Sequence, residues 1–183
     1  MNMPRIVFMG TPDFALPALD TLYQGHYPIC AVVTQPDRPA GRGQRDLAPP
    51  VKILAEKLGL TVLQPQKVKE APFLKTLRAL RPDMIVVAAF GQILPGAILD
   101  LPKLGWLNIH PSLLPKYRGA APLNWSIIRG ETVTGVTIML MDEGMDSGDI
   151  LMQEETPLGP AETAGELHDR LARLGASLLT QTI

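Results

Sequence analysis

Short apolar runs, most of them ended by a glycine or a polar residue, recur along the chain. Arg5–Met9, Ile29–Thr34 and Met84–Ala88 are apolar almost throughout, a pattern typical of strands that are covered on both faces. Shorter or more mixed runs predict further strands at Thr61–Leu63, Gly105–His110, Gly135–Leu140 and Ile150–Glu155.

Helical periodicity fills most of the intervals between these runs. After the first strand we expect Thr11 to cap a helix with Pro12 in its first position; its apolar face would be Phe14, Leu16, Leu19 and Leu22. Further helices are predicted over Val51–Leu58, Ala71–Leu80, Pro122–Arg129 and Thr163–Leu179. The segment Gln35–Pro50 is rich in proline, glycine and arginine and is predicted to be a loop.

Apolar strands that alternate with helices predict an α/β fold, a Rossmann-like and mostly parallel twisted sheet with helices on both faces. Gly135–Leu140 and Ile150–Glu155 have no helix between them, so these later strands are expected to be antiparallel. Ligands of such folds gather at the carboxyl ends of the strands. The rule directs attention to the loops after Met9, Thr34, Ala88, His110 and Leu140.

Composition narrows the class of protein. The 183 residues suit a single domain over 1–183, and a hydrophobic content of 46% is enough for a core. The net charge of −1 gives no general sign of nucleic-acid binding, which would therefore need a local patch. The single cysteine, Cys30, allows no disulfide within the chain, and no apolar stretch is long enough to span a membrane. We expect a cytoplasmic protein.

The sequence lacks the motifs of several common cofactor and metal sites. Gly10-Thr11-Pro12 follows the first strand where a dinucleotide-binding protein would carry G-x-G-x-x-G, and there is no Walker loop. The histidines at 26, 110 and 168 have no metal-ligand spacing among themselves or with Cys30, so no zinc site is predicted.

The densest group of functional side chains lies in Asn108–Pro115. Asn108 and His110 are two residues apart on a predicted strand and so share a face, while Ile109 points the opposite way. An amide beside an imidazole can bind an oxyanion, and the imidazole can also move a proton. The alternative is a polar strand end that the backbone satisfies.

A second group is the acidic, glycine-containing segment Asp142–Gly148, which follows a predicted strand. A carboxylate at Asp146 near His110 would orient the imidazole ring and favour its charged form. The alternative is a simple turn, or an acidic loop without the full calcium-ligand pattern.

Asn108, His110 and Asp146, with the Ser112-Leu113-Leu114-Pro115 run, resemble the catalytic set of the folate-dependent formyltransferases, and the resemblance extends from about Arg5 to the end of the chain. It implies 10-formyltetrahydrofolate as donor, an oxyanion held by Asn108 and protonated His110, proton relay aided by Asp146, and no metal. The residues implied in folate binding are Phe90, Gln92, Ile93, Leu94, Ser112, Leu113, Leu114, Pro115, Asp142, Glu143 and Gly144. For Ile93 and Leu94, core packing is the alternative.

Within the family, Phe8–Ala15, Gln35–Gln44 and Arg118–Pro122 are most similar to the members that act on methionyl-tRNA. The resemblance implies initiator methionyl-tRNA as partner, contacted by Arg38, Arg42 and Arg45, and a monomer is expected. A solvated loop is the alternative. Those members continue into a basic C-terminal barrel domain, whereas this chain stops at Ile183 inside a helical pattern, so we expect a fragment without that domain.

Three other functions are compatible with the sequence. One is formyl transfer to a sugar nucleotide or another small amine, against which the arginine-rich loop argues. Another is hydrolysis of formyltetrahydrofolate with water as acceptor. The third is a non-catalytic tRNA-binding module, which the net charge of −1 and the complete Asn–His–Asp set disfavour.

Overall fold

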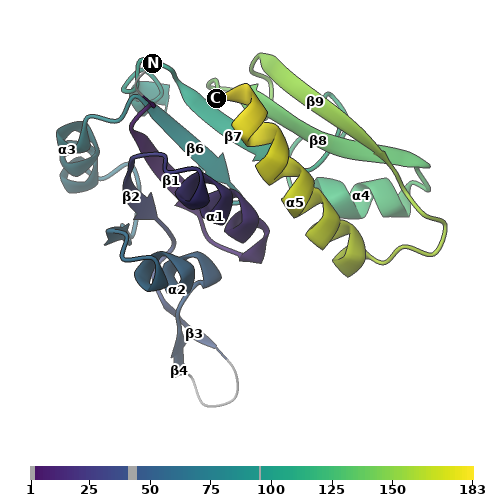
Figure 1. Cartoon of the computed structure of the whole chain (residues 1–183), viewed down its shortest axis with the longest axis horizontal. Helices are drawn as coiled ribbons and strands as arrows, with labels where there is room; N and C mark the ends of the chain where they lie inside the picture. Colours follow the sequence, from purple (N-terminus) through teal and green to yellow (C-terminus); the bar gives the residue numbers. More distant parts are fainter. Residues whose placement is uncertain (1–2, 41–44, 95) are drawn as a thin grey trace.

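The fold is a computed structural model that describes residues 3–40, 45–94 and 96–183. In this part of the chain, seven strands form one sheet in the order β5-β2-β1-β6-β7-β8-β9 (Figure 1). The parallel strands are β1 (Ile6–Gly10), β2 (Ile29–Val33), β5 (Val62–Leu63), β6 (Met84–Ala88) and β7 (Trp106–His110). The strands β8 (Val133–Leu140) and β9 (Ile150–Pro157) pair antiparallel. The predicted α/β class and the antiparallel end of the sheet are confirmed.

Helices cover both faces of the sheet. One face packs against α1 (Leu16–Gln24), α2 (Pro50–Lys57), α4 (Pro122–Ile128) and α5 (Ala164–Thr182). The other packs against α3 (Ala71–Leu80) and the short 3-10 turn η2 (Gly96–Ile98). Figure 1 shows α1 and α5 lying side by side across the sheet, with α3 at its far edge.

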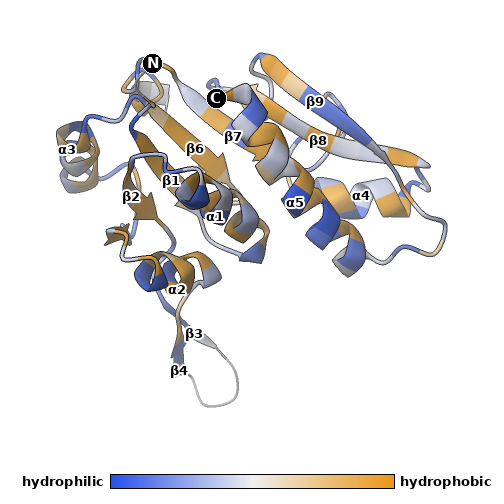
Figure 2. Cartoon of the chain, in the orientation of Figure 1, coloured by the Kyte–Doolittle hydropathy of each residue, from blue (hydrophilic) through white to orange (hydrophobic). Residues whose placement is uncertain are grey.

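Burial follows from position in the sheet. Every residue of β1 and β6 is buried, since both faces of these central strands are covered. Figure 2 shows both strands hydrophobic along most of their length. The edge strand β9 instead alternates between exposed and half-buried residues, because only one of its faces packs against the protein.

The first strand-to-helix connection differs from the prediction. Thr11 does not cap a helix: its hydroxyl donates to the carbonyl of Phe90 at 2.8 Å. A 3-10 turn, η1 (Asp13–Ala15), comes first, and α1 then begins at Leu16 with Pro17 in its first turn. The threonine therefore ties the loop after β1 to the loop after β6.

The predicted loop Gln35–Pro50 contains a second, two-stranded sheet. Its strands β3 (Arg38–Ala40) and β4 (Arg45–Leu47) pair antiparallel and project from the main sheet (Figure 1). Arg38 precedes a proline, which biases it toward extended backbone. The base of the hairpin is held by Asp37, which accepts from Lys52 at 2.6 Å and from Gln64 at 2.7 Å.

The strand order places the carboxyl ends of β1 and β6 at a switch point. From β1 the chain continues to β2 on one side, and β6 then returns to pair on the other side of β1. Connections that leave in opposite directions open a crevice at the strand ends, where doubly wound proteins bind ligands.

Candidate active site

A cavity of about 1010 Å³ opens at the carboxyl ends of β1, β6 and β7. The loop after β1 contributes residues 12–14, the loop after β6 residues 89–92, and β7 with its end residues 108–111. The first turns of α4 and α5 complete the wall. The cavity therefore occupies the crevice that the strand order predicts.

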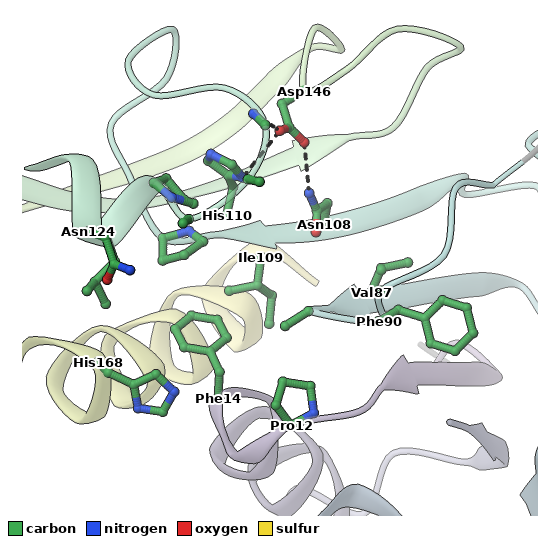
Figure 3. Close-up of a pocket in the computed structure, with 18 of the residues that line it drawn as sticks. Pro12, Phe14, Val87, Phe90, Asn108, Ile109, His110, Asn124, Asp146 and His168 are labelled. Atoms are coloured by element: carbon green, nitrogen blue, oxygen red, sulfur yellow. Dashed lines mark hydrogen bonds and ion pairs between the residues drawn. The ribbon is translucent and has the colours of Figure 1, made fainter. Parts of the chain in front are cut away.

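Two polar side chains of β7 enter this cavity from the same face of the strand, as the alternation along the strand requires. Asn108 and His110 line it, and Figure 3 shows both rising from the same side of the strand end. His110 is only 5% exposed. Ile109 is buried between them and belongs to the core on the α5 side of the sheet.

Asp146 lies beside these two residues, joined to them by the dashed contacts in Figure 3. One carboxylate oxygen accepts from Asn108 Nδ2 at 3.4 Å, and the other lies 3.7 Å from His110 Nδ1. That second oxygen also accepts from the backbone N–H of Gly119 at 2.7 Å. The structure thus brings together the three residues predicted to be catalytic, although Asp146 comes from a different loop.

The His110 ring is fixed at one nitrogen and free at the other. Nε2 lies 2.9 Å from the carbonyl oxygen of Tyr117, to which it can donate. The 3.7 Å separation between Nδ1 and Asp146 exceeds hydrogen-bond length. In the imidazolium form, in which both ring nitrogens carry a proton, Nδ1–H can donate to an acceptor in the cavity, as can the second amide proton of Asn108. Two donors and a carboxylate around one point can bind an oxyanion and exchange a proton.

The turn that carries Tyr117 is held from outside the cavity. Its hydroxyl donates to the carboxylate of Glu131, which also accepts from Lys116 at 3.1 Å. These hydrogen bonds, that from Tyr117 first, hold the pKa of Glu131 below its ordinary value. The carboxylate therefore stays charged and anchors the turn whose carbonyl orients His110.

Residues 90–94, which follow β6, do not all face the same cavity. Phe90, Gln92 and Leu94 line the cavity. Ile93 does not: it is 90% exposed and lines a neighbouring groove of about 390 Å³. Core packing of Ile93, the alternative raised from the sequence, is therefore wrong. Gln92 borders both spaces, and its side-chain oxygen accepts from the N–H of Val68 at 3.0 Å.

The Ser112–Pro115 run does not reach the cavity. Ser112 is buried and donates to the carbonyl of Lys116 at 2.5 Å, while the N–H of Leu114 donates to Thr137 Oγ1 at 3.1 Å. Leu113 lines a separate pocket together with Ser112. Ser112, Leu113, Leu114 and Pro115 are absent from the cavity lining and support the turn behind His110, and their contact with folate stays a prediction.

The acidic loop contributes less to the wall than expected. Met141 and Asp146 line the cavity, whereas Asp142, Glu143 and Gly144 are exposed outside its lining. Asp142 stabilises the loop itself, because it accepts from the N–H of Gly144 and from the hydroxyl of Ser147, each at 2.9 Å. The segment is a bent loop that carries Asp146, and contact of Asp142, Glu143 and Gly144 with folate stays a prediction.

The arginines of the hairpin are only partly described. Arg38 is exposed, and its guanidinium donates to Gln35 Oε1 at 3.2 Å. Arg42 and the side chain of Arg45 lie outside the described part of the chain. Contact between these residues and tRNA stays a prediction.

Phe14, Asn124 and His168 are among the cavity residues that the sequence does not assign to the site. The sequence places Phe14 only on the apolar face of a helix and Asn124 only within a helix, and it offers His168 only as a possible metal ligand. The rings of Phe14 and His168 meet edge to face with centroids 5.5 Å apart. Both residues line the cavity, but only the packing of α5 against η1 brings them together.

The described residues contain neither a membrane-spanning helix nor a cluster of metal-ligand side chains. Within residues 3–40, 45–94 and 96–183 no helix is long and apolar enough to cross a membrane. In the same ranges no three histidine, cysteine, aspartate or glutamate side chains gather as metal ligands.

The sequence pattern of the formyl transferase family matches residues 4–183, and the chain belongs to that family. It is 63% identical over 178 residues to the methionyl-tRNA formyltransferase of Syntrophus aciditrophicus, covering 97% of this chain and 57% of that protein. The corresponding enzyme of Citrifermentans bemidjiense is 59% identical, covering 100% of this chain and 58% of that protein. The chain thus spans less than two thirds of the curated relatives it matches.

Solved structures share the fold at lower identity. Glycinamide ribonucleotide transformylase 1 from Symbiobacterium toebii superposes with a TM-score of 0.82 at 24% identity, covering 100% of this chain and 86% of that one. Phosphoribosylglycinamide formyltransferase from Brucella melitensis gives 0.77 at 26%, covering 98% and 93%. The sheet described above is therefore the formyltransferase fold.

Proposed function

We propose that this chain is the catalytic part of an enzyme that transfers a formyl group from 10-formyltetrahydrofolate to the amino group of methionyl-tRNA. The main support for the proposal is that Asn108, His110 and Asp146 line the same cavity and contact one another there. The choice of acceptor is supported by relatives at 63% and 59% identity that are named methionyl-tRNA formyltransferases.

In the proposed reaction the free amine attacks the formyl carbon and forms a tetrahedral intermediate. Asn108 Nδ2 and His110 Nδ1 donate hydrogen bonds to its oxyanion, which carries charge that the ground state lacks. Asp146 accepts the proton that the amine loses. A water molecule passes that proton to the folate nitrogen as the bond from this nitrogen to the formyl carbon breaks.

The donor would enter from the side of Phe90. Phe90, Leu94 and Met141 supply apolar surface there, and the exposed backbone of Gly91 can present polar groups to the edge of the pterin ring. Of the residues expected to bind folate, Phe90, Gln92 and Leu94 stand at the cavity. We propose these three residues as donor contacts.

The full-length protein with labelled 10-formyltetrahydrofolate tests the proposal against its rivals. Three acceptor conditions are compared: methionyl-tRNA, an amino-sugar nucleotide, and no acceptor. We expect formylmethionyl-tRNA to form at least ten times faster than either the formylated sugar or free formate. Faster sugar formylation would favour a small-amine enzyme, and rapid formate release without acceptor would favour a hydrolase. No turnover under any condition would favour a non-catalytic module.

The protein is also proposed to act as a monomer. Light scattering of the purified full-length protein during gel filtration would test this, and a mass twice that of the chain would refute it.

A further inference from the structure

Gln35 is a buried polar residue that the proposed reaction does not use. It lies between β2 and the hairpin of β3 and β4, and it is 8% exposed. It lines two grooves that border residues 89–93, and it is not part of the described lining of the main cavity. Any effect of Gln35 on substrates in that cavity must therefore pass through the residues that it contacts.

The side-chain amide of Gln35 contacts the donor loop, by which we mean residues 90–94 after β6. Its Nε2 donates to the carbonyl oxygen of Phe90 at 3.3 Å, and its Oε1 accepts from Nε2 of Gln92 at 3.4 Å. Phe90 and Gln92 are two of the three proposed donor contacts. Gln35 thus holds the backbone of one donor contact and the side chain of another.

The backbone at the start of the donor loop needs such support. Ala89 and Gly91 flank Phe90 with positive φ angles of 46° and 86°, a left-handed conformation that is unfavourable for alanine. The carbonyl of Phe90 accepts a second hydrogen bond from Thr11 Oγ1 at 2.8 Å, and that hydroxyl accepts from the backbone N–H of Gln35 at 3.3 Å. The loops after β1, β2 and β6 are therefore joined around one carbonyl oxygen.

The same amide also contacts the hairpin that is predicted to bind tRNA. The Oε1 atom of Gln35 accepts from Nη2 of Arg38 at 3.2 Å. A guanidinium has five N–H donors, so Arg38 can keep this hydrogen bond and still bind a phosphate group. Arg38 is exposed, whereas Gln35 is buried. A ligand that restrains the exposed arginine can thus restrain the buried amide bonded to it.

We propose that Gln35 is a positioning residue for the formyl donor, and that it links the donor loop to the hairpin through Arg38. The inference rests on the proposed function, since it takes folate and tRNA as the two substrates. When a phosphate of the tRNA holds Arg38, the Gln35 amide is held as well, and Phe90 and Gln92 lose less freedom when the donor binds. Donor and tRNA should therefore each bind more tightly in the presence of the other, by the same factor. Gln35 itself touches no reacting atom.

The test measures donor affinity with and without tRNA on the full-length protein. Uncharged initiator tRNA serves as the probe, because it lacks the amino group that would consume 10-formyltetrahydrofolate. Equilibrium dialysis gives the dissociation constant of the donor alone and with saturating tRNA. For the wild type we expect tRNA to tighten donor binding about fivefold or more, the range in which coupling between two sites usually falls.

Two variants break the link at its two ends. Gln35→Met keeps the length of the side chain but removes its hydrogen bonds, so donor binding without tRNA should weaken about tenfold. The effect of tRNA on donor affinity should disappear in this variant. Arg38→Gln should also abolish the effect of tRNA, because the shortened side chain no longer joins the hairpin to Gln35.

Gln64→Met is the matched control. Among the described residues, both hydrogen bonds of the Gln64 amide go to the base of the hairpin, to the backbone oxygen of Gln35 at 2.9 Å and to Asp37 at 2.7 Å. Neither reaches the donor loop, so donor affinity without tRNA should stay within about twofold of wild type.

Wild-type donor affinity in Gln35→Met would overturn the positioning role. An effect of tRNA that is absent from the wild type, or that is equal in the wild type and both variants, would overturn the link to the hairpin. If Gln35→Met did not fold, Arg38→Gln alone would decide. A wild-type protein that failed to formylate methionyl-tRNA would overturn the proposed function instead, whatever the effect of tRNA on donor affinity.

Discussion

Gly175 on α5 lies directly behind β7, the strand that carries Asn108 and His110, and its replacement by alanine perturbs the site from outside the cavity. A Cβ atom at this position would lie 2.6 Å from Ile109 Cγ2 and 3.4 Å from Val136 Cγ1. Ile109 is β-branched, 3% exposed, and placed between Asn108 and His110. The new methyl group must therefore displace α5 or the middle of β7.

Two opposing effects set the size of the change in stability. Overpacking a well-filled core costs about 1–3 kcal/mol. Replacing glycine by alanine inside a helix stabilises the folded state by about 1 kcal/mol. The net loss is then about 0–2 kcal/mol, and at roughly 2–4 °C per kcal/mol the melting temperature should fall by up to about 8 °C. The catalytic loss should be larger, because a displacement of about 1 Å can cost on the order of 100-fold in rate.

The assay combines urea unfolding with single-turnover formyl transfer on the full-length protein. We expect Gly175→Ala to lose at least about tenfold in transfer rate through displacement of Asn108 or His110. Gly165→Ala on the same helix is the stability control, because nothing lies within 4 Å of the added Cβ; it should gain about 0.5–1 kcal/mol. A Gly175→Ala protein with wild-type stability and wild-type transfer would refute this account of how α5 supports the strand.

Three further substitutions probe single charges. Asp146→Asn keeps a residue that tolerates the local φ of 49°, so the loss of charge alone should slow transfer by about 10²–10⁴-fold; near wild-type turnover would contradict a proton-transfer role. A hydrogen bond from Arg170 holds the pKa of Glu162 below its ordinary 4.5. Its stabilising effect is present above that value and is lost as pH falls through the lower folded pKa, so the difference in melting temperature between wild type and Glu162→Gln should shrink below pH 4.5; a constant difference would argue against the pairing. Arg38→Gln should reduce the slope of log affinity for tRNA against log salt concentration by about 1, the effect of one lost phosphate contact. An unchanged slope would mean that Arg38 is solvated and does not contact tRNA.

Elements defined by a continuous local pattern could be predicted closely from the sequence. β6 and α3 have the predicted bounds, Met84–Ala88 and Ala71–Leu80. β6 is apolar on both faces, as a central strand must be. α3 ends at Leu80, and Arg81, the residue before Pro82, is disfavoured from continuing the helix. Neither element therefore depends on distant contacts. Asn108 and His110 could be placed on one face for the same reason, because alternation along a strand is fixed by its geometry.

The remaining features depend on contacts between distant segments. Thr11 pairs with Phe90 rather than capping a helix, because tertiary hydrogen bonding overrides a local cap preference. The sequence around Ser112 could not indicate which way the turn after β7 faces. His168 lies on the last helix, and only the packing of α5 against η1 carries it to the cavity. Local pattern thus located the strand that carries Asn108 and His110, and contacts between distant segments determined the rest of the cavity wall.

Asn108 and His110 are proposed to stabilise charge that develops during formyl transfer. This role is tested by single-turnover transfer from 10-formyltetrahydrofolate to methionyl-tRNA, measured together with donor affinity in Asn108→Ala and His110→Ala. Each variant should bind the donor within twofold of wild type and lose about 10²–10³ in rate, the usual effect of one missing oxyanion donor. Near wild-type turnover in His110→Ala would contradict the assignment of the active site.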